Sequence, residues 1–301
     1  MTLPKSVKMV EVGARDGLQN EPGTLPTELK VAFIDRLSAT GLPVIEAGSF
    51  VSPKAVPQMA DTDEVMGRIE QKPGVSYPAI AFIIRGLERA IASKIEEIAV
   101  GTAASETFSQ KNTNCSIEES YERCRSICDA AAEEGLRVRG YVSCVLGCPY
   151  EGETDPELVA DMAKEMADMG CYEISLGDTI GTGTPERAKA MIDAVAKKVP
   201  IEKLALHFHD TYGQALANIY AGLELGVAVV DSSVSGLGGC PYAPGAAGNV
   251  ASEDVLYMLN GMGIETGVDF DKLVEAGRFI TDAIGRPPVS KVAQAMRAKA
   301  S

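Results

Sequence analysis

The chain has 301 residues, of which 46% are hydrophobic and 23% are charged, enough material for one large core. Its formal net charge of -14 excludes a sequence-independent grip on nucleic-acid phosphates, because that grip requires clustered lysine and arginine. The seven cysteines, an odd number, favour a reducing compartment over a disulfide framework, and no segment approaches the roughly 18 apolar residues that a membrane span requires.

The N-terminal segment carries no apolar run typical of a signal peptide, and Glu11 comes too early for an acid-poor transit peptide. We therefore expect a cytoplasmic location. Beyond it, short β-branched segments alternate with longer amphipathic ones, which is typical of repeated strand–helix units in a parallel sheet. The eight strands that we expect span residues 7–12, 44–47, 76–83, 97–100, 137–145, 172–176, 204–209 and 229–233.

Amphipathic patterns between these strands predict helices, several of which have clear start and stop signals. Ser116 with Glu119 predicts a capping box, and Asp155 precedes a proline at a first-turn position. Four glycines stand where a helix would close on a left-handed residue, at positions 41, 135, 170 and 226. The predicted helices span residues 27–39, 117–134, 156–169, 185–199 and 215–225.

Eight strand–helix units close a barrel more naturally than they fill an open sheet, although a doubly wound fold has the same alternation. We therefore predict a single α/β domain over residues 1–301, a TIM (β/α)8 barrel. Residues 264–301 are expected to add C-terminal helices that pack on the outside of the barrel or on a partner subunit.

Polar side chains gather at four predicted strand ends. These are residues 13–16 after the first strand, Glu46 with Ser49 at the second, 177–179 after the sixth and 207–210 at the seventh. Active sites of TIM barrels collect at the C-terminal ends of the strands. The four polar ends are therefore expected to converge in space.

His207 and His209 are the only histidines in the chain, and residues two apart on a strand point to the same face. Two imidazoles at one strand end favour a metal pair over isolated structural histidines, with Asp16 as a third ligand. A nitrogen and oxygen ligand set without thiolate suits Mg²⁺ or Mn²⁺. Arg15 beside Asp16 is either an exposed ion pair or a group that reaches developing charge on a substrate.

A glycine-rich loop over residues 236–245 follows the eighth strand and is predicted to act as a lid. Cys240 at its centre could exchange protons if its thiol enters a cationic site, although most cysteines are buried packing residues. Asn249 ends this loop. It is either the N-cap of a following helix, with Glu253 nearby, or a residue of the site.

Seven segments together closely resemble the 3-hydroxy-3-methylglutaryl-CoA (HMG-CoA) lyases of the DRE-TIM metallolyase superfamily. The resemblance implies cleavage of HMG-CoA to acetyl-CoA and acetoacetate, as in leucine degradation, with Mg²⁺ or Mn²⁺ bound by Asp16, His207, His209 and Asn249. It also implies an acyl-CoA substrate and a homodimer. The segments span residues 11–21, 46–59, 114–120, 139–152, 173–185, 207–218 and 236–249.

The resemblance implies further roles for residues of the predicted site. Arg15 would stabilise the enolate oxygen, and Cys240 would take part in proton transfer. We name His207 as the candidate base for the tertiary hydroxyl, in relay with Asp178. Contacts that hold the substrate or order the site are implied for Gln19, Glu46, Ser49, Asn112, Arg139 and Ser175.

Three other functions fit parts of the pattern. A Claisen-type synthase of the same superfamily shares the Arg-Asp strand end and the histidine pair, but typically carries a Gly-Glu-Arg-Ala-Gly-Asn loop where this chain has Cys240. A non-haem iron oxygenase also uses two histidines and one carboxylate. A catalytically silent metal-binding barrel is the third alternative.

Overall fold

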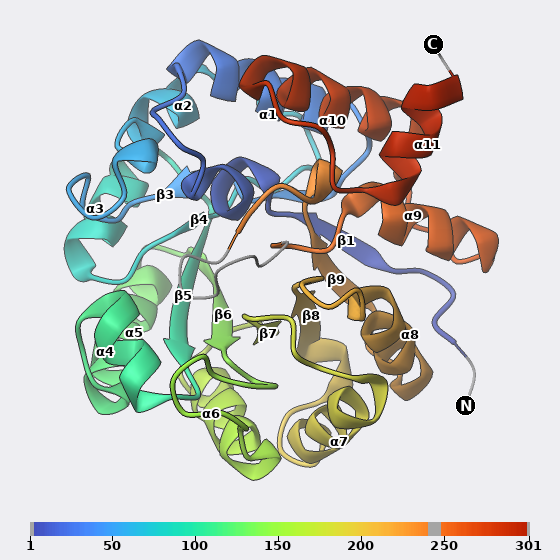
Figure 1. Cartoon of the computed structure of the whole chain (residues 1–301). Coiled ribbons are helices and arrows are strands. Elements are labelled where there is room, and N and C mark those ends of the chain that lie inside the picture. The colour runs from blue at the N-terminus through green and yellow to red at the C-terminus, as the bar shows by residue number, and fades with distance from the viewer. Residues whose placement is uncertain (1–2, 240–247, 300–301) are drawn as a thin grey trace.

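The computed structural model describes residues 3–239 and 248–299, in which parallel strands form a ring enclosed by helices (Figure 1). The strands pair in the order β2-β1-β9-β8-β7-β6-β5-β4-β3. Their bounds are β1 Lys8–Glu11, β2 Val44–Ile45, β3 Gly48–Ser49, β4 Ala79–Ile80, β5 Glu97–Ala103, β6 Arg137–Ser143, β7 Glu173–Asp178, β8 Leu204–Phe208 and β9 Val229–Ser232.

The ring closes through one short segment, because β2 and β3 are consecutive parts of residues 44–49. The Glu46 amide donates to the Glu11 carbonyl of β1 at 2.8 Å, and the Ala47 amide donates to the Pro78 carbonyl at 2.8 Å. Eight of the nine strands of the described residues fall at the eight predicted positions, β3 lies just beyond the strand predicted over 44–47, and the predicted TIM-barrel fold is confirmed. The predicted strand over 76–83 is reduced to β4, next to Pro78, which has no amide hydrogen to donate.

The helices lie outside the ring, and all five predicted helices are confirmed with ends that differ by no more than three residues. The bounds are α1 Thr27–Ser38, α2 Thr62–Arg68, α3 Ile84–Ala92, α4 Glu106–Thr113, α5 Ile117–Glu133, α6 Pro156–Asp168, α7 Pro185–Ala196, α8 Ala215–Leu225, α9 Ser252–Gly261, α10 Phe270–Ile284 and α11 Lys291–Lys299. None of the helices formed by the described residues is long and apolar enough to cross a bilayer.

The start and stop signals act as predicted. Both hydrogen bonds of the Ser116–Glu119 capping box are present, and the Asp155 side chain accepts the amide hydrogen of Glu157. The four predicted closing glycines all have positive φ angles, as at Gly226, the C-cap of α8. Local capping chemistry therefore fixes several helix ends independently of the barrel.

The C-terminal helices pack on the outside of the barrel. In α10, a Cβ atom on Gly277 would lie 2.4 Å from a carboxylate oxygen of Glu253, so this close approach requires glycine. The guanidinium of Arg36 in α1 stacks over the ring of Phe279, 3.8 Å from its centroid. The helices of residues 264–299 therefore pack against α1 and α9 on the outside of the barrel.

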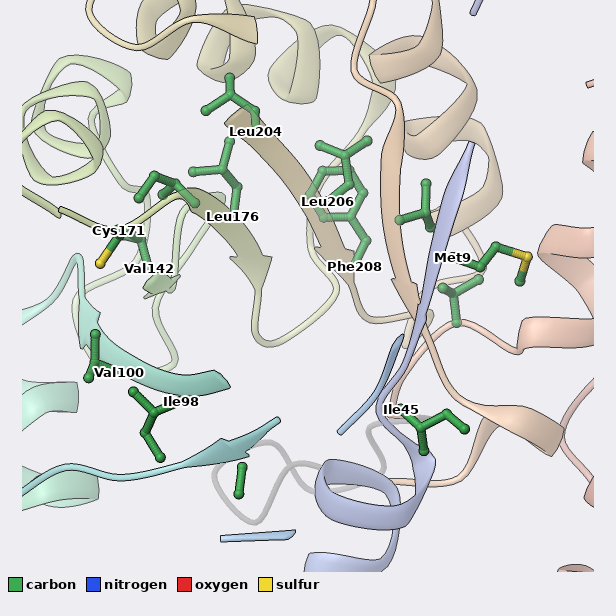
Figure 2. Close-up of a cluster of buried hydrophobic side chains, with 14 of the residues drawn as sticks. Met9, Ile45, Ile98, Val100, Val142, Cys171, Leu176, Leu204, Leu206 and Phe208 are labelled. Atoms are coloured by element: carbon green, nitrogen blue, oxygen red, sulfur yellow. The ribbon is translucent and has the colours of Figure 1, made fainter. Parts of the chain in front are cut away.

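Alternation along the strands divides the side chains between two layers. Leu204, Leu206 and Phe208 of β8 belong to the apolar layer between strands and helices (Figure 2). Ala205 and His207 have the opposite parity and point into the ring. Ala205 packs there in a small apolar cluster with Val10 and Val229, and His207 continues the same inner row toward the C-terminal end.

Candidate active site

Three predicted ligands meet at the C-terminal end of the ring. One ligand atom from each of Asp16, His207 and His209 lies within 4.8 Å of the other two. His207 lies in β8, and His209 is the first residue after the end of that strand. Asn249 joins them, because its Nδ2 donates to Asp16 Oδ2 at 2.8 Å and its backbone bridges to His209. The structure thus brings together all four residues of the predicted metal set.

The N-cap reading of Asn249 is wrong. Helix α9 begins three residues later, at Ser252, and its N-cap residue is Ala251. The Asn249 amide points instead to Asp16 and to the carbonyl oxygen of Leu237, which accepts at 3.2 Å. Its side chain therefore belongs to the site and not to the helix start.

A π-helical turn, η1 (Gly13–Gly17), places Arg15 and Asp16 immediately after β1. Such turns are rare and occur frequently at functional sites. A Cβ atom on Gly13 would lie 2.5 Å from a carboxylate oxygen of Glu11, so glycine is needed where the turn begins. The turn aims the two adjacent side chains into the mouth of the ring.

The electrostatics keep the ligands in the form that binds cations. Burial opposes ionisation of Asp16, but Arg15 and the two imidazoles together lower its pKa to about 2. Burial, followed by the neighbouring His207, lowers the pKa of His209 to about 4. Near neutral pH this trio therefore offers a carboxylate and at least one neutral imidazole.

One buried nitrogen of the site has no partner within the described residues. His209 Nδ1 is shielded from solvent and makes no hydrogen bond there. An orphaned buried nitrogen is costly unless a ligand or ion satisfies it. The Asp16 carboxylate, the Asn249 amide and the two imidazoles form a nitrogen and oxygen donor set that fits a divalent cation.

Arg15 is held by two carboxylates. Its Nη1 donates to Asp16 Oδ1 at 2.6 Å, and its Nε donates to Glu46 Oε2 at 2.6 Å. Only 9% of the Arg15 side chain is exposed, so the reading of Arg15–Asp16 as an exposed surface pair is wrong. Burial raises the pKa of Glu46 even though Arg15 lies beside it.

Beneath these residues, a chain of buried polar groups runs through the inside of the ring. Arg139 of β6 donates to both oxygens of Asp231, from Nη2 to Oδ1 at 2.6 Å and from Nη1 to Oδ2 at 2.9 Å. Its Nη1 also donates to the Tyr141 hydroxyl, which donates to Glu46. Asp231 Oδ2 lies 3.2 Å from His207 Nδ1.

Asp231 and Tyr141 are site residues that the sequence reasoning missed. One signal was available for Asp231, because it is the one charged residue in the predicted strand over 229–233. Its partners come from β6, β7 and β8, and none of these contacts could be read without the register of the sheet. Burial opposes ionisation of Asp231, but Arg139 and His207 hold its pKa well below the usual range.

The site opens into a cavity of about 660 Å³, which is within the usual size range of small-molecule sites. Gln19 and Asn112 line this cavity with Arg15 and both histidines, as a substrate-contact role requires. Glu46, Ser49, Arg139 and Ser175 are at most 1% exposed and are absent from the cavity wall. Their positions favour ordering of the site over direct contact with a substrate.

Asp178 points away from the ring. Its carboxylate accepts the amide hydrogens of Gly183 at 2.8 Å and Thr182 at 3.2 Å. Burial raises its pKa to about 6, although these two bonds oppose the shift. The neighbouring Gly177 and Thr179 line the cavity in its place. The structure therefore does not bring Asp178 to His207, with which a proton relay was predicted.

Cys240 lies outside the described residues, but the base of its loop is described on both sides. A Cβ atom on Gly248 would lie 2.6 Å from the backbone carbonyl carbon of Gly238. Gly238 and Gly248 both have positive φ angles. The two arms of the loop therefore meet backbone to backbone, next to Asn249.

The HMGL-like family model matches residues 6–280. The chain belongs to the HMGL-like family. It is 59% identical over 98% of its length to the mitochondrial hydroxymethylglutaryl-CoA lyase of Mus musculus, of which it covers 90%. It is 59% identical over the full length of both chains to the 3-hydroxy-3-isohexenylglutaryl-CoA/hydroxy-methylglutaryl-CoA lyase of Pseudomonas aeruginosa.

The fold of this HMGL-like chain also matches a solved relative. A crystal structure of hydroxymethylglutaryl-CoA lyase from Pseudomonas aeruginosa superposes with a TM-score of 0.97, over 99% of this chain and 100% of that one. The two sequences are 59% identical over the match. Neither of the two curated relatives is named a synthase or an oxygenase.

Proposed function

We propose that the protein is a divalent-metal-dependent carbon–carbon lyase that cleaves HMG-CoA to acetyl-CoA and acetoacetate. The observation that carries the proposal is the meeting of Asp16, His207 and His209 within 4.8 Å, with the guanidinium of Arg15 bonded to the same aspartate. A cation held by these ligands and the Arg15 guanidinium would both lie beside the cavity of about 660 Å³, where they could stabilise a negatively charged oxygen of a bound substrate. Membership of the HMGL-like family supports it.

The reaction breaks the bond between C2 and C3 of the acyl group. The tertiary hydroxyl loses its proton, its oxygen becomes the ketone of acetoacetate, and the electron pair of the broken bond passes to the thioester as an enolate. A proton added to C2 then completes acetyl-CoA. The site must therefore remove one proton, stabilise an enolate oxygen and return one proton.

Asp16, His207, His209 and Asn249 would hold the cation. The donor set, without thiolate, supports Mg²⁺ or Mn²⁺. When bound, a divalent cation supplies Lewis acidity that makes a coordinated hydroxyl easier to deprotonate. His207 has a single nitrogen, Nε2, on the Asp16 side, so metal binding and proton acceptance are alternatives for that atom.

Arg15 is proposed to stabilise the enolate oxygen. Its two bonds to Asp16 and Glu46 fix the guanidinium before substrate arrives, so little reorganisation is needed as charge develops. Cys240 is proposed to return the proton to C2, because its loop is anchored at Gly238 and Gly248 beside Asn249. These assignments give a group to the enolate charge and to the proton returned to C2, and His207 would accept the hydroxyl proton only if its Nε2 does not hold the cation.

The test is a coupled assay for acetoacetate from HMG-CoA, with and without chelator. We expect turnover that is abolished by EDTA and restored by Mg²⁺ or Mn²⁺. An Asp16→Asn variant should lose most of that metal-dependent turnover. Thiol release from acetyl-CoA and a 2-oxo acid, without HMG-CoA cleavage, would instead establish the synthase alternative.

A longer substrate is a second candidate, because the name of the Pseudomonas aeruginosa relative includes 3-hydroxy-3-isohexenylglutaryl-CoA. Comparing kcat/KM for both thioesters would rank them. We also propose that residues 1–301 form one catalytic domain, with 264–301 as its helical extension. The homodimer and the cytoplasmic location stay predictions, which gel filtration and cell fractionation can test.

A further inference from the structure

His207 lies between two carboxylates, one beside each nitrogen of its ring. Its Nδ1 is 3.2 Å from Asp231 Oδ2, and its Nε2 is 3.8 Å from Asp16 Oδ2. The first separation is at the outer edge of hydrogen-bond distances, whereas the second is too long for one. The two nitrogens therefore have different surroundings, and of the two carboxylates only that of Asp231 lies within hydrogen-bond distance of the ring.

Asp231 is itself fixed in place. Arg139 donates to both of its oxygens, and the Ser175 hydroxyl donates to Oδ2 at 2.8 Å. Arg139 and Asp231 are 1% and 2% exposed, so water cannot replace these bonds. A paired guanidinium and carboxylate in two-point contact form a rigid unit. The oxygen that faces His207 consequently has little freedom to move.

This geometry decides which nitrogen of a neutral His207 carries the hydrogen. An ionised carboxylate only accepts hydrogen bonds, so the nitrogen beside Asp231 must be the donor. The hydrogen then lies on Nδ1, and the lone pair of Nε2 faces Asp16. A ligand histidine whose other nitrogen donates to a carboxylate is oriented and made more basic by that bond.

We propose that Asp231 is a positioning residue of the metal centre, which holds His207 as the Nδ1–H tautomer with Nε2 directed at the cation. Arg139 and Ser175 act by holding Asp231 and do not touch the substrate. The inference rests on the proposed metal site. It gives these two buried residues a role that differs from the substrate contacts expected from the sequence.

The first test reads the tautomer without any metal. The chain has only two histidines, so ¹⁵N-histidine labelling yields four ring nitrogens. In wild-type protein at about pH 8.5, above the ordinary range for histidine, the His207 spectrum should show a protonated Nδ1 and an unprotonated Nε2. A His207→Gln variant assigns the signals. Protonation on Nε2 in the wild-type protein would overturn the proposal.

The second test compares two carboxylates that share Arg139. Asp231→Leu removes the one that contacts His207, and Glu173→Met removes the other, which accepts from Arg139 Nε at 2.8 Å. Asp231→Leu should weaken Mn²⁺ binding in calorimetric titration about 10–100-fold, because an outer partner of a ligand is lost. Glu173→Met should stay within about threefold of the wild-type protein.

A conservative variant guards against simple misfolding. Asp231→Asn keeps one acceptor oxygen for Nδ1, so its Mn²⁺ affinity should fall between those of the wild-type protein and Asp231→Leu. Equal losses in Asp231→Leu and Glu173→Met would overturn the proposal, since a general disturbance of Arg139 would then explain both. Wild-type protein that binds Mn²⁺ but never releases acetoacetate would reject the proposed function and leave this inference standing.

Discussion

Two groups of buried carboxylates lie under the same end of the barrel and are stabilised in opposite ways. Inside the ring, Asp231 contacts Arg139, and its pKa is lowered. Outside the ring, between the strands and α9, Glu11 and Glu253 are fully buried and form no ion pair within the described residues. Burial raises the pKa of Glu11 to about 7 and that of Glu253 to about 8.

The partners explain the difference. Glu11 accepts the amide hydrogens of Gly13 and Val234 and the hydroxyl of Ser252, all neutral donors. Glu253 accepts the amide hydrogen of Ser235. Neutral donors satisfy the oxygens but cannot offset the cost of burying a charge. Asp231 therefore stays charged beside the site, whereas Glu11 and Glu253 hold the surrounding turns together and can be neutral.

The largest expected effect comes from removing Arg139, the cation that pairs with the buried carboxylates of Asp231 and Glu173. Arg139→Met would leave Asp231 and Glu173 buried without their arginine, so we expect the free energy of unfolding to fall by about 3–5 kcal/mol. Urea denaturation would measure it. Arg125→Met in α5 is the control, because that side chain is 54% exposed and its partner Glu165 is 38% exposed, so its loss should cost no more than about 1 kcal/mol. Similar losses of unfolding free energy in the two variants would show that the buried Arg139 ion pair contributes no more to stability than an exposed one.

The next largest effect is expected from removing the positive charge of Arg15 from the site. Arg15→Met should lower kcat about 10²–10³-fold, or about 3 kcal/mol, with a smaller change in KM, because its donors act as charge develops. Arg123→Met, at another arginine that lines the cavity, should change KM more than kcat. If Arg15→Met raised KM and left kcat intact, the guanidinium would be a substrate anchor instead.

The outer group should make stability depend on pH. Folded Glu11 keeps its proton to about pH 7, whereas the unfolded chain releases it near 4.5. The folded state binds more protons between these values, so its stability falls as pH rises through that window and levels off above it. Glu11→Gln cannot ionise, and it should remove on the order of 1–2 kcal/mol of that decline.

Thermal unfolding of wild-type protein and Glu11→Gln at pH 5, 6, 7 and 8 measures this difference. Other titrating groups are common to both proteins, so they cancel in the comparison. The wild-type Tm should fall relative to that of the variant between pH 5 and 7, by about 2–4 °C for each kcal/mol. Parallel curves would mean that Glu11 is ionised throughout the range.

The sequence was sufficient to predict which strand ends carry the site, but not which buried residues contact one another. Strand parity was enough to place His207 and His209 on one face, and strand ends were enough to bring Asp16 to them. Hydrophobic periodicity predicted the long helices but not α2, α3 and α4, which have 7, 9 and 8 residues and lie in the connections. Short helices leave few turns in which a period of 3.6 residues can be detected.

The buried partners could not be predicted, because they depend on register. Asp231 reaches His207 only because the two residues are paired across β8 and β9. Glu11 appeared as one of two charged residues in a predicted strand, yet its partners Val234 and Ser252 are more than 220 residues away. Asp178 was expected to follow a strand that ends at residue 176, but β7 continues to Asp178, and the alternation of side chains along the strand turns this carboxylate away from the cavity.

The smallest expected effect separates two roles for Ser175. Its hydroxyl donates to Asp231 Oδ2, on which Arg139 and His207 also converge, so Ser175→Ala removes one of three contacts to that oxygen. We expect a stability loss of about 1 kcal/mol. KM for HMG-CoA should stay unchanged, because Ser175 is fully buried below the cavity floor. A several-fold rise in KM with unchanged stability would instead indicate that Ser175 contacts the substrate. It would then also support the substrate contact first expected for Arg139.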